Sequence, residues 1–173
     1  MRCLLVAINS KYIHSNPAVY LLRECALRDL KQKQIFGVEV ELAEYTINHH
    51  ASEIFDDIYL HHADLVCFSC YIWNLRYVEE LIREIHKILP ETVLWAGGPE
   101  VSYDAKKVLT REPDVCGVMR GEGELTFTEL VRAYLKREEL CAASLDLDHI
   151  PGITYRAESG EVVERGPQRL LSL

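Results

Sequence analysis

The strongest constraint on the fold is a series of five short segments with strand-like hydrophobicity, separated by longer segments with helical periodicity. The segments centre near residues 5, 41, 67, 94 and 117. Such spacing suits strand–helix–strand crossovers, each of which joins two parallel neighbours in one sheet. The sequence therefore predicts an α/β fold with a doubly wound, five-stranded parallel sheet of the flavodoxin or Rossmann type.

One of the five segments differs from the others in its pattern. Residues 38–42 alternate strictly between apolar and acidic side chains, whereas the other four segments are nearly continuous apolar runs. Alternation predicts a strand with one wet face, which is most often an edge strand. The expected strand order is therefore 2-1-3-4-5. Near the C-terminus, residues 152–156 and 161–164 flank Ser159-Gly160, a pattern that predicts a β-hairpin.

Polar residues mark the starts of the predicted helices. Asn16 precedes a proline at the first helical position, which predicts an N-cap followed by a helix. Ser52 is the expected cap of a second helix, and Asn74 that of a third with apolar residues at 3–4–3–4 spacing. A weaker helix is predicted over residues 102–111.

Composition excludes several classes of function. The 173-residue chain is 49% hydrophobic and 27% charged, as expected for a globular domain. Its net charge of −8 argues against a general nucleic-acid binder, which needs clustered Lys and Arg. No apolar run approaches the length of a membrane span, so we expect a cytoplasmic protein without membrane contact. In that compartment the six cysteines are expected to be thiols.

Three unusual loops follow predicted strands. They cover residues 9–16, 69–74 and 97–100, the last of which is Gly97-Gly98-Pro99-Glu100. In the order 2-1-3-4-5 the chain reverses direction between the first and third strands, and ligands bind at that switch point beyond the carboxyl ends. Two adjacent glycines remove side chains there, and the proline ends the strand. A plain tight turn is the alternative, but the convergence of three loops favours a ligand site.

Other possible chemistry is weakly supported. Cys67 and Cys70 form a C-x-x-C, but Cys67 lies inside an apolar strand, so a redox role is disfavoured. A zinc site would need a second cysteine pair at matching spacing. The paired histidines at 49/50 and 61/62 have the wrong spacing for ligands and are expected at solvated helix ends. His14, in the first loop, could ligate a metal or simply bond to backbone. The sequence contains neither a P-loop motif nor a dinucleotide fingerprint.

With these residues considered, the sequence resembles the N-terminal cobalamin-binding domain of cobalamin-dependent radical S-adenosylmethionine enzymes. The similarity covers nearly the whole chain and depends on matches that are weak singly but occur in the family's order. The matches are the strand at 2–8, Ser69, Ala96-Gly97-Gly98-Pro99-Glu100, Arg120-Gly121-Glu122-Gly123-Glu124 with Phe127, and the hairpin from Gly152 through Gly166-Pro167.

The resemblance implies a cofactor and a site. In such domains the corrin lies across the carboxyl ends of the strands, and the dimethylbenzimidazole tail inserts beside the Ser and Gly-Gly loops. The loop beginning at Gly121 is expected to present backbone amides to the ligand. The implied cofactor-binding residues are Asn9, Lys11, His14, Ser69, Cys70, Tyr71, Gly97, Gly98, Pro99, Glu100, Gly121 and Glu122.

The chain departs from this family in its first loop. Cobalamin domains of the methionine-synthase type carry D-x-H-x-x-G, whose histidine is the lower axial cobalt ligand. Here Lys11 takes the histidine position and His14 the glycine position. Many radical enzymes of this group also lack that histidine, so we expect cobalamin without a protein ligand on its lower face. His14 is a possible substitute cobalt ligand.

The catalytic half implied by the resemblance is not found in this sequence. No C-x-x-x-C-x-x-C for an iron–sulfur cluster occurs, and the chain ends where a linker into the catalytic barrel is expected. We therefore expect residues 1–137 to form the cobalamin-binding domain and 138–173 a linker and hairpin. S-adenosylmethionine and the iron–sulfur cluster are expected only in a C-terminal radical domain of the same polypeptide, so this chain alone should not be catalytic.

Two other functions stay open. The domain could have kept the fold, lost cobalamin, and act as an interaction or substrate-gating module, as the altered first loop suggests. It could also be a flavodoxin-like binder of another phosphate-bearing ligand. A response-regulator function fails at the first loop, which lacks the acidic cluster that such proteins require.

Overall fold

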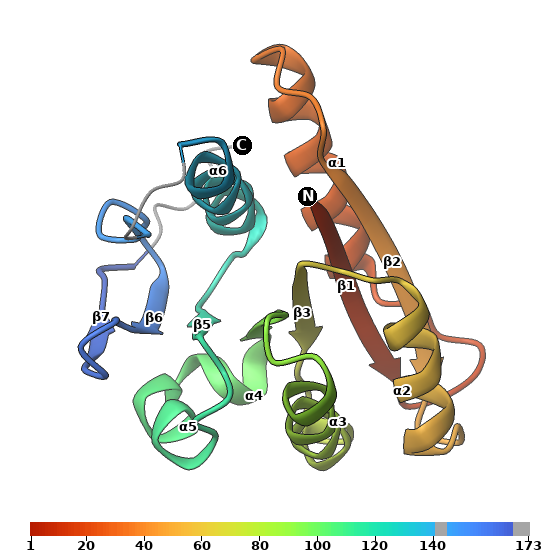
Figure 1. Ribbon diagram of the computed structural model, residues 1–173. Helices are drawn as coiled ribbons and strands as arrows, with labels where there is room; N and C mark the ends of the chain where they lie inside the picture. The colour runs from red at the N-terminus through yellow and green to blue at the C-terminus, as the bar shows by residue number, and fades with distance from the viewer. Residues whose placement is uncertain (141–144, 168–173) are drawn as a thin grey trace.

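A seven-stranded sheet organises the molecule (Figure 1). The computed structural model describes residues 1–140 and 145–167. Strands β1 to β5 are parallel, β6 runs antiparallel to β5, and β7 antiparallel to β6. The strands are β1 (Arg2–Asn9), β2 (Glu39–Thr46), β3 (Leu65–Ser69), β4 (Val93–Gly97), β5 (Gly117–Met119), β6 (Ile153–Arg156) and β7 (Val162–Glu164). Their order, β2-β1-β3-β4-β5-β6-β7, confirms the predicted fold class and places the hairpin in the same sheet.

Helices cover both faces of the sheet (Figure 1). One face carries α1 (Pro17–Gln32) and α6 (Glu124–Leu140), which pack against each other. The other face carries α2 (Ala51–Leu60), α3 (Leu75–Ile88) and α5 (Ala105–Arg111), while the short α4 (Pro99–Ser102) follows β4 directly. The helix expected over residues 102–111 corresponds to α5, which begins three residues later than expected, because Ser102 is the last residue of the separate short helix α4.

Of the three residues predicted to cap helices, only one makes the expected hydrogen bond to its helix. Asn16 caps α1 as expected, since its Oδ1 accepts a hydrogen bond from the backbone N–H of Ala18. Ser52 is not a cap: α2 begins at Ala51, and Glu53 reaches back to the N–H of His50 at 2.9 Å. Asn74 occupies the N-cap position of α3 but makes no side-chain bond to the helix.

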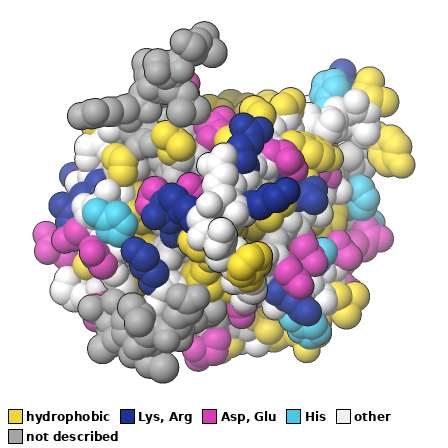
Figure 2. Space-filling view, turned by 90° about the horizontal axis from the view of Figure 1, so that it is seen from above, with side chains coloured by type: hydrophobic (Ala, Val, Ile, Leu, Met, Phe, Trp, Pro, Cys, Tyr) yellow, Lys and Arg dark blue, Asp and Glu magenta, His cyan; other side chains and the backbone are white. Residues whose placement is uncertain are grey.

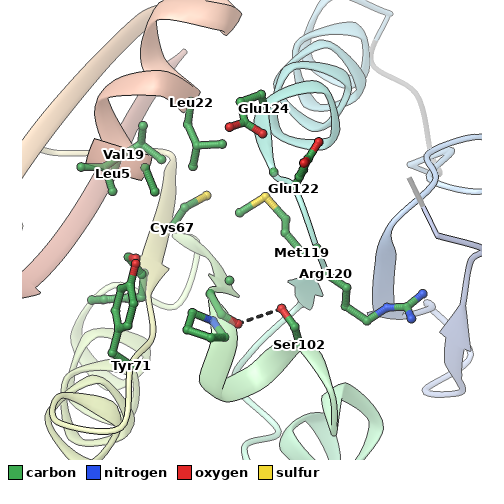
Figure 3. Close-up of a pocket in the computed structure, with 18 of the residues that line it drawn as sticks. Leu5, Val19, Leu22, Cys67, Tyr71, Ser102, Met119, Arg120, Glu122 and Glu124 are labelled. Carbon is green, nitrogen blue, oxygen red and sulfur yellow. Dashed lines mark hydrogen bonds between the residues drawn. The ribbon is translucent and has the colours of Figure 1, made fainter. Parts of the chain in front are cut away.

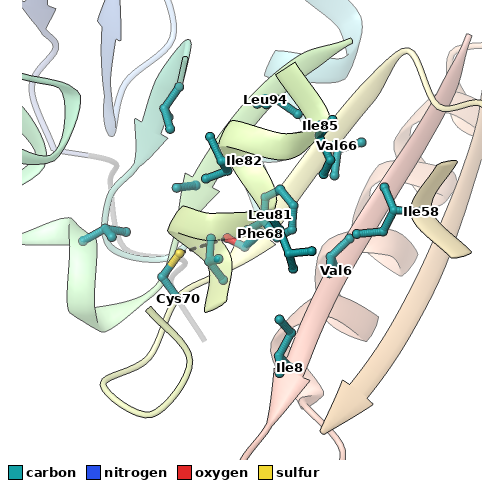
Figure 4. Close-up of a cluster of buried hydrophobic side chains, with 14 of the residues drawn as sticks. Val6, Ile8, Ile58, Val66, Phe68, Cys70, Leu81, Ile82, Ile85 and Leu94 are labelled. Atoms are coloured by element: carbon teal, nitrogen blue, oxygen red, sulfur yellow. Dashed lines mark hydrogen bonds between the residues drawn. The ribbon is translucent and has the colours of Figure 1, made fainter. Parts of the chain in front are cut away.

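The face under α2, α3 and α5 is closely packed (Figure 4). Strand side chains that alternate along β1 and β3 meet the apolar stripes of the helices. All are almost completely buried, so each contributes roughly 1.5–3 kcal/mol by leaving water. The members at the centre of this cluster are Val6, Ile8, Ile58, Val66, Phe68, Leu81, Ile82, Ile85 and Leu94.

The opposite face contains a second core with a different arrangement. Trp95 fills the space above Gly117, where a Cβ atom would lie 2.5 Å from the indole ring. The indole N–H donates a hydrogen bond of 3.0 Å to the hydroxyl of Tyr134 on α6. The indole therefore fills this face at the middle of the sheet. Two residues further along β4, at Gly97, the space above the sheet is no longer filled.

Candidate functional site

A cavity of about 650 Å³ opens at the carboxyl edge of the sheet, on the face covered by α1 and α6 (Figure 3). It is bounded by the ends of β3, β4 and β5, by the first turns of α1 and α6, and by α4. Most of its wall is apolar. The lining residues are Leu5, Ala18, Val19, Leu22, Cys67, Phe68, Ser69, Tyr71, Gly97, Gly98, Pro99, Ser102, Tyr103, Met119, Arg120, Gly121, Glu122, Gly123, Glu124 and Pro167.

Strand register explains why the cavity lies here. Ser69, Gly97 and Met119 are paired across β3, β4 and β5, so their positions form one row on the same face. Gly97 has no side chain, which leaves the row open between its neighbours. A Cβ atom added there would lie 3.5 Å from the carbonyl oxygen of Met119, an ordinary contact distance. Because Gly97 has no side chain, its backbone forms the floor of the cavity.

The neighbouring glycine has a different function. Gly98 has φ of +104°, a backbone conformation that side chains rarely adopt. A Cβ atom there would lie 2.5 Å from the carbonyl oxygen of Cys70. The N–H of Cys70 in turn donates to the carbonyl of Gly97 at 2.7 Å, and Ser102 Oγ donates to that of Gly98 at 2.8 Å. Gly98 therefore allows the two loops to touch and directs the chain into α4.

Ser69 is held by the first loop. Asn16 Nδ2 donates to Ser69 Oγ at 2.9 Å, while the Oδ1 atom of the same side chain caps α1. One amide thus fixes both the start of α1 and the hydroxyl that lines the cavity. Asn74 supports the adjoining loop, because its Nδ2 donates to the carbonyls of Ile8 and Ser69 at 3.0 and 2.9 Å.

Glu44 on β2 anchors the other end of the first loop. Its carboxylate accepts hydrogen bonds from Asn9 Nδ2 at 3.0 Å, from the N–H of Asn16 at 2.9 Å, and from the hydroxyl of Tyr20. Burial by itself would raise the pKa of this carboxyl, but the three donors outweigh that effect and lower the pKa. Glu44 is therefore ionised at neutral pH and ties β1, β2 and α1 together.

The start of α6 forms the upper rim of the cavity. Gly121 has φ of +74°, which lets the chain turn after β5, and the next three residues also line the cavity. Arg120 extends away toward the hairpin, where its guanidinium meets Glu164 at 2.8 Å (Figure 3). Glu124 is turned toward Leu22, and its buried Oε2 atom has no hydrogen-bond partner among residues 1–140 and 145–167.

The structure brings together seven of the twelve residues predicted to bind the cofactor. Those that line the cavity are Ser69, Tyr71, Gly97, Gly98, Pro99, Gly121 and Glu122. Asn9 lies nearby but is bonded to Glu44, and Lys11, His14 and Glu100 are exposed outside the cavity lining. Cobalt ligation by His14 stays a prediction.

Cys70 and Cys67 lie on opposite faces of the sheet. Cys67 packs under α1 and α6, whereas Cys70 belongs to the core under α3 and donates to the carbonyl of Phe68. Burial raises the pKa of Cys70 to about 12 and that of Cys67 well above its usual value. The two thiols are therefore neither placed for a disulfide nor activated as nucleophiles.

Several lining residues were missed by sequence reasoning. Val19, Leu22 and Met119 are apolar, and nothing in the sequence alone distinguishes them from ordinary core residues. Glu124 belongs to the segment Arg120–Glu124 that matches the family, but it was not among the predicted cofactor-binding residues. The signal that could have found Met119 is its register with Gly97, since a residue beside a strand-terminal glycine borders the space that the glycine leaves.

Two further observations concern membrane spans and metal ligands. Within residues 1–140 and 145–167, no helix has the length and apolar composition needed to cross a bilayer. In the same part of the chain, no three His, Cys, Asp or Glu side chains are grouped as a metal site would require.

Figure 2 looks down on the face of α1 and α6, where acidic and basic side chains are interspersed.

Comparison with known proteins gives this site a context. A methyltransferase from Streptantibioticus cattleyicolor that acts on 2-(S-pantetheinyl)-carbapenam-3-carboxylate is 32% identical over 111 residues, which is 62% of this chain and 15% of that protein. The cobalamin-dependent radical SAM methyltransferase TokK of Streptomyces tokunonensis is 29% identical over 107 residues, with the same coverage. This chain thus spans only a small part of these relatives.

Solved structures show the same fold. The cobalamin-dependent S-adenosylmethionine radical enzyme OxsB, solved with aqua-cobalamin and S-adenosylmethionine bound, superposes with a TM-score of 0.71 at 22% identity. The match covers 98% of this chain and 22% of OxsB. The sequence model of the B12 binding domain matches residues 6–131, which is most of the chain and includes the cavity floor. The membership predicted from the loops is confirmed: this chain belongs to the B12-binding domain family.

Proposed function

We propose that this chain is the cobalamin-carrying part of a longer radical S-adenosylmethionine enzyme. The observation that carries the proposal is the open cavity above Gly97 at the carboxyl edge of the sheet. The relatives in which a similar segment occurs include a cobalamin-dependent radical SAM methyltransferase. Methyl transfer or related radical chemistry in the full-length protein is therefore the proposed activity, and this chain supplies binding and orientation.

The residues present fit a cofactor with a flat aromatic tail. The cavity volume of about 650 Å³ is in the range of small-molecule sites. Its deep wall, made by Leu5, Val19 and Met119, is apolar and suits a dimethylbenzimidazole ring. Ser69 Oγ accepts from Asn16, so its proton is free to donate to a ligand acceptor. We propose that the nucleotide tail enters this cavity beside Ser69 and Gly97.

The rim of the site fits the corrin. Tyr12 and Ile13 in the first loop, Ile72 after β3, and Tyr103 after α4 are all strongly exposed apolar side chains. The rings of Tyr71 and Trp73 stack with centroids 4.5 Å apart, and Trp73 Nε1 donates to a β1 carbonyl. Exposed apolar groups on three loops at one edge are expected where a large ligand or second domain covers them.

Lys11 and His14, the first-loop residues considered as cobalt ligands, are both exposed. Cobalamin supplies a cobalt centre that carries a methyl group or exchanges electrons. We propose that neither side chain would bind cobalt, and that Ser69 and the apolar wall of the cavity would hold the nucleotide tail away from the metal. This chain's residues would then act by holding the tail, positioning the ring and excluding water from the cavity.

The remainder of the proposed enzyme follows from the relatives. S-adenosylmethionine and an iron–sulfur cluster would belong to a C-terminal radical domain of the same polypeptide. The division into a cobalamin-binding domain over 1–137 and a linker with hairpin over 138–173 stays a proposal; residues 141–144 and 168–173 lie outside the described part. The expectations of a cytoplasmic location and of no contact with nucleic acid or membrane depend on composition and stay predictions.

The proposal is tested by titrating the 173-residue chain with hydroxocobalamin and following the visible spectrum. We expect cobalamin to be retained through desalting with a base-off spectrum. Failure to retain cobalamin at any concentration would contradict the proposal and favour a module that has lost its cofactor. A flavin-coloured protein after purification would instead indicate a flavodoxin-like ligand.

A further inference from the structure

Glu124 is an unusual member of the cavity wall. It is the first residue of α6, and its carboxylate is turned toward Leu22 of α1 at the upper rim of the cavity (Figure 3). Its Oε2 atom is buried and has no hydrogen-bond partner in the described structure. The position near a helix N-terminus favours a negative charge, but this oxygen accepts no bond from the helix.

The described surroundings give the Oε2 atom of this carboxylate no hydrogen-bond donor. Leu22 and Met119 are apolar, and the neighbouring arginine, Arg120, is directed to Glu164 at 2.8 Å. A buried acceptor without a donor costs free energy, and more so when it is charged. The terminal torsion of Glu is broad, so either oxygen can turn into the cavity. A ligand in the cavity could therefore supply the hydrogen-bond donor that this oxygen lacks.

We propose that Glu124 is a positioning residue that accepts a hydrogen bond from a ribose hydroxyl of the cofactor's nucleotide tail. The inference rests on the proposed function. The tail contains, in order, the aromatic base, ribose and a phosphate that leads to the corrin. The apolar depth of the cavity suits the base, and Glu124 lies at its rim, where the adjacent ribose would follow. A carboxylate repels the anionic phosphate, so a hydroxyl is the tail group that it can bind.

The test compares Glu124→Ala and Glu124→Gln with the unaltered chain. Affinities are measured by spectral titration for hydroxocobalamin and for hydroxocobinamide, which lacks the nucleotide tail. Thermal unfolding of each protein without corrinoid measures any purely structural contribution. Glu24→Ala is the matched control, because it removes the same charge from an exposed position on α1.

We expect Glu124→Ala to weaken cobalamin binding by roughly tenfold to a hundredfold, as for a lost hydrogen bond to a charged group. Glu124→Gln, which keeps an acceptor oxygen, should lie between. Cobinamide affinity and the unfolding temperature without corrinoid should not fall, and Glu24→Ala should bind like the unaltered chain.

Three results would overturn the proposal. These are unchanged cobalamin affinity in Glu124→Ala, an equal loss for cobinamide, or a loss that tracks a lower unfolding temperature without corrinoid. If neither the unaltered chain nor Glu124→Ala retains cobinamide, the nucleotide tail supplies the affinity. The ratio of the two proteins' cobalamin affinities then decides the test. If the unaltered chain binds no cobalamin at all, the proposed function itself fails, which is a different outcome from an unaltered affinity in Glu124→Ala.

Discussion

The two faces of the sheet use the same strands for different purposes. Under α2, α3 and α5, side chains such as Ile8 and Ile82 fill the space to the carboxyl edge (Figure 4). Under α1 and α6, the core is filled as far as Trp95 but gives way to a cavity above Gly97 (Figure 3). One face thus provides stability, and the other keeps room for a ligand at the carboxyl edge.

The difference arises at the level of single strand positions. Because successive residues point to opposite faces, Ala96 packs on the closed face, whereas Gly97 borders the cavity on the open one. A change at either position should therefore affect stability or binding selectively. Gly98, where the turn packs against Cys70, is the point on which both faces depend.

The largest effect is expected from Gly98→Ala. A Cβ atom would lie 2.5 Å from the carbonyl oxygen of Cys70, and φ of +104° is strained for any side chain. We expect a loss of about 3 kcal/mol or more in the free energy of unfolding, measured by urea denaturation. A larger change such as Gly98→Leu should damage the fold as well. An unaltered unfolding midpoint would show that the turn can relax.

The packed face should respond in stability alone. Ile82→Ala removes an almost completely buried side chain that does not line the cavity, and should cost about 2–5 kcal/mol in unfolding free energy. Cobalamin affinity, titrated at a temperature where the variant is folded, should stay within about twofold of the unaltered chain. A large loss of affinity in folded Ile82→Ala would show that the two faces are not separate.

The open face should respond in binding alone. Gly97→Leu places a side chain in the cavity, since its Cβ atom fits at 3.5 Å from Met119. We expect cobalamin affinity to fall by at least about a hundredfold, because the tail loses its apolar site, with little change in unfolding temperature. Gly97→Ala is the control and should have a smaller effect. Full affinity in Gly97→Leu would place the tail elsewhere.

Much of this fold could be predicted from sequence. The apolar runs and the alternation over 38–42 correctly gave the strand order, because in a parallel sheet covered on both faces burial dictates composition. Asn16 as a cap was also predictable, since capping is local. Asn74 was not, because its side chain bonds to the carbonyls of Ile8 and Ser69 instead of to its own helix.

The site could be predicted only in part. A glycine pair at a strand end indicated the correct edge, but not that, of these two lining residues, Gly98 is the one whose backbone packs on Cys70. That distinction depends on backbone torsions and on a contact between two loops. Glu124 and Leu22 meet across the gap between two helices that lie far apart in the chain, a proximity that no local pattern encodes.

A moderate effect is expected where the first loop supports the open face. Asn16→Ala removes both the cap of α1 and the donor to Ser69, so it should cost about 1–2 kcal/mol in unfolding free energy. Asn16→Ser, which keeps a capping oxygen, should recover part of this loss. The measurement is urea denaturation of both variants, and equal stabilities would mean that the cap contributes nothing.

The smallest effect concerns pH. The pKa of Glu44 is lowered from its usual 4.5, so its contribution to stability is present above that value and is lost as pH falls through the lower, folded-state pKa. Glu44→Gln should therefore unfold at a lower temperature than the unaltered chain at pH 6, with the difference shrinking toward pH 3. A difference that is constant over this range would exclude the carboxylate's charge as its cause.

The contrast between the two faces is tested most directly by mapping backbone amide chemical shifts during titration with hydroxocobalamin. The aromatic tail should shift the amides of Ser69, Gly97 and Gly121 most, because these line the open cavity. Amides of α3, such as those of Val78 and Ile82, should move little. Shifts centred on α2 and α3, or binding without change at Ser69 and Gly97, would contradict the account.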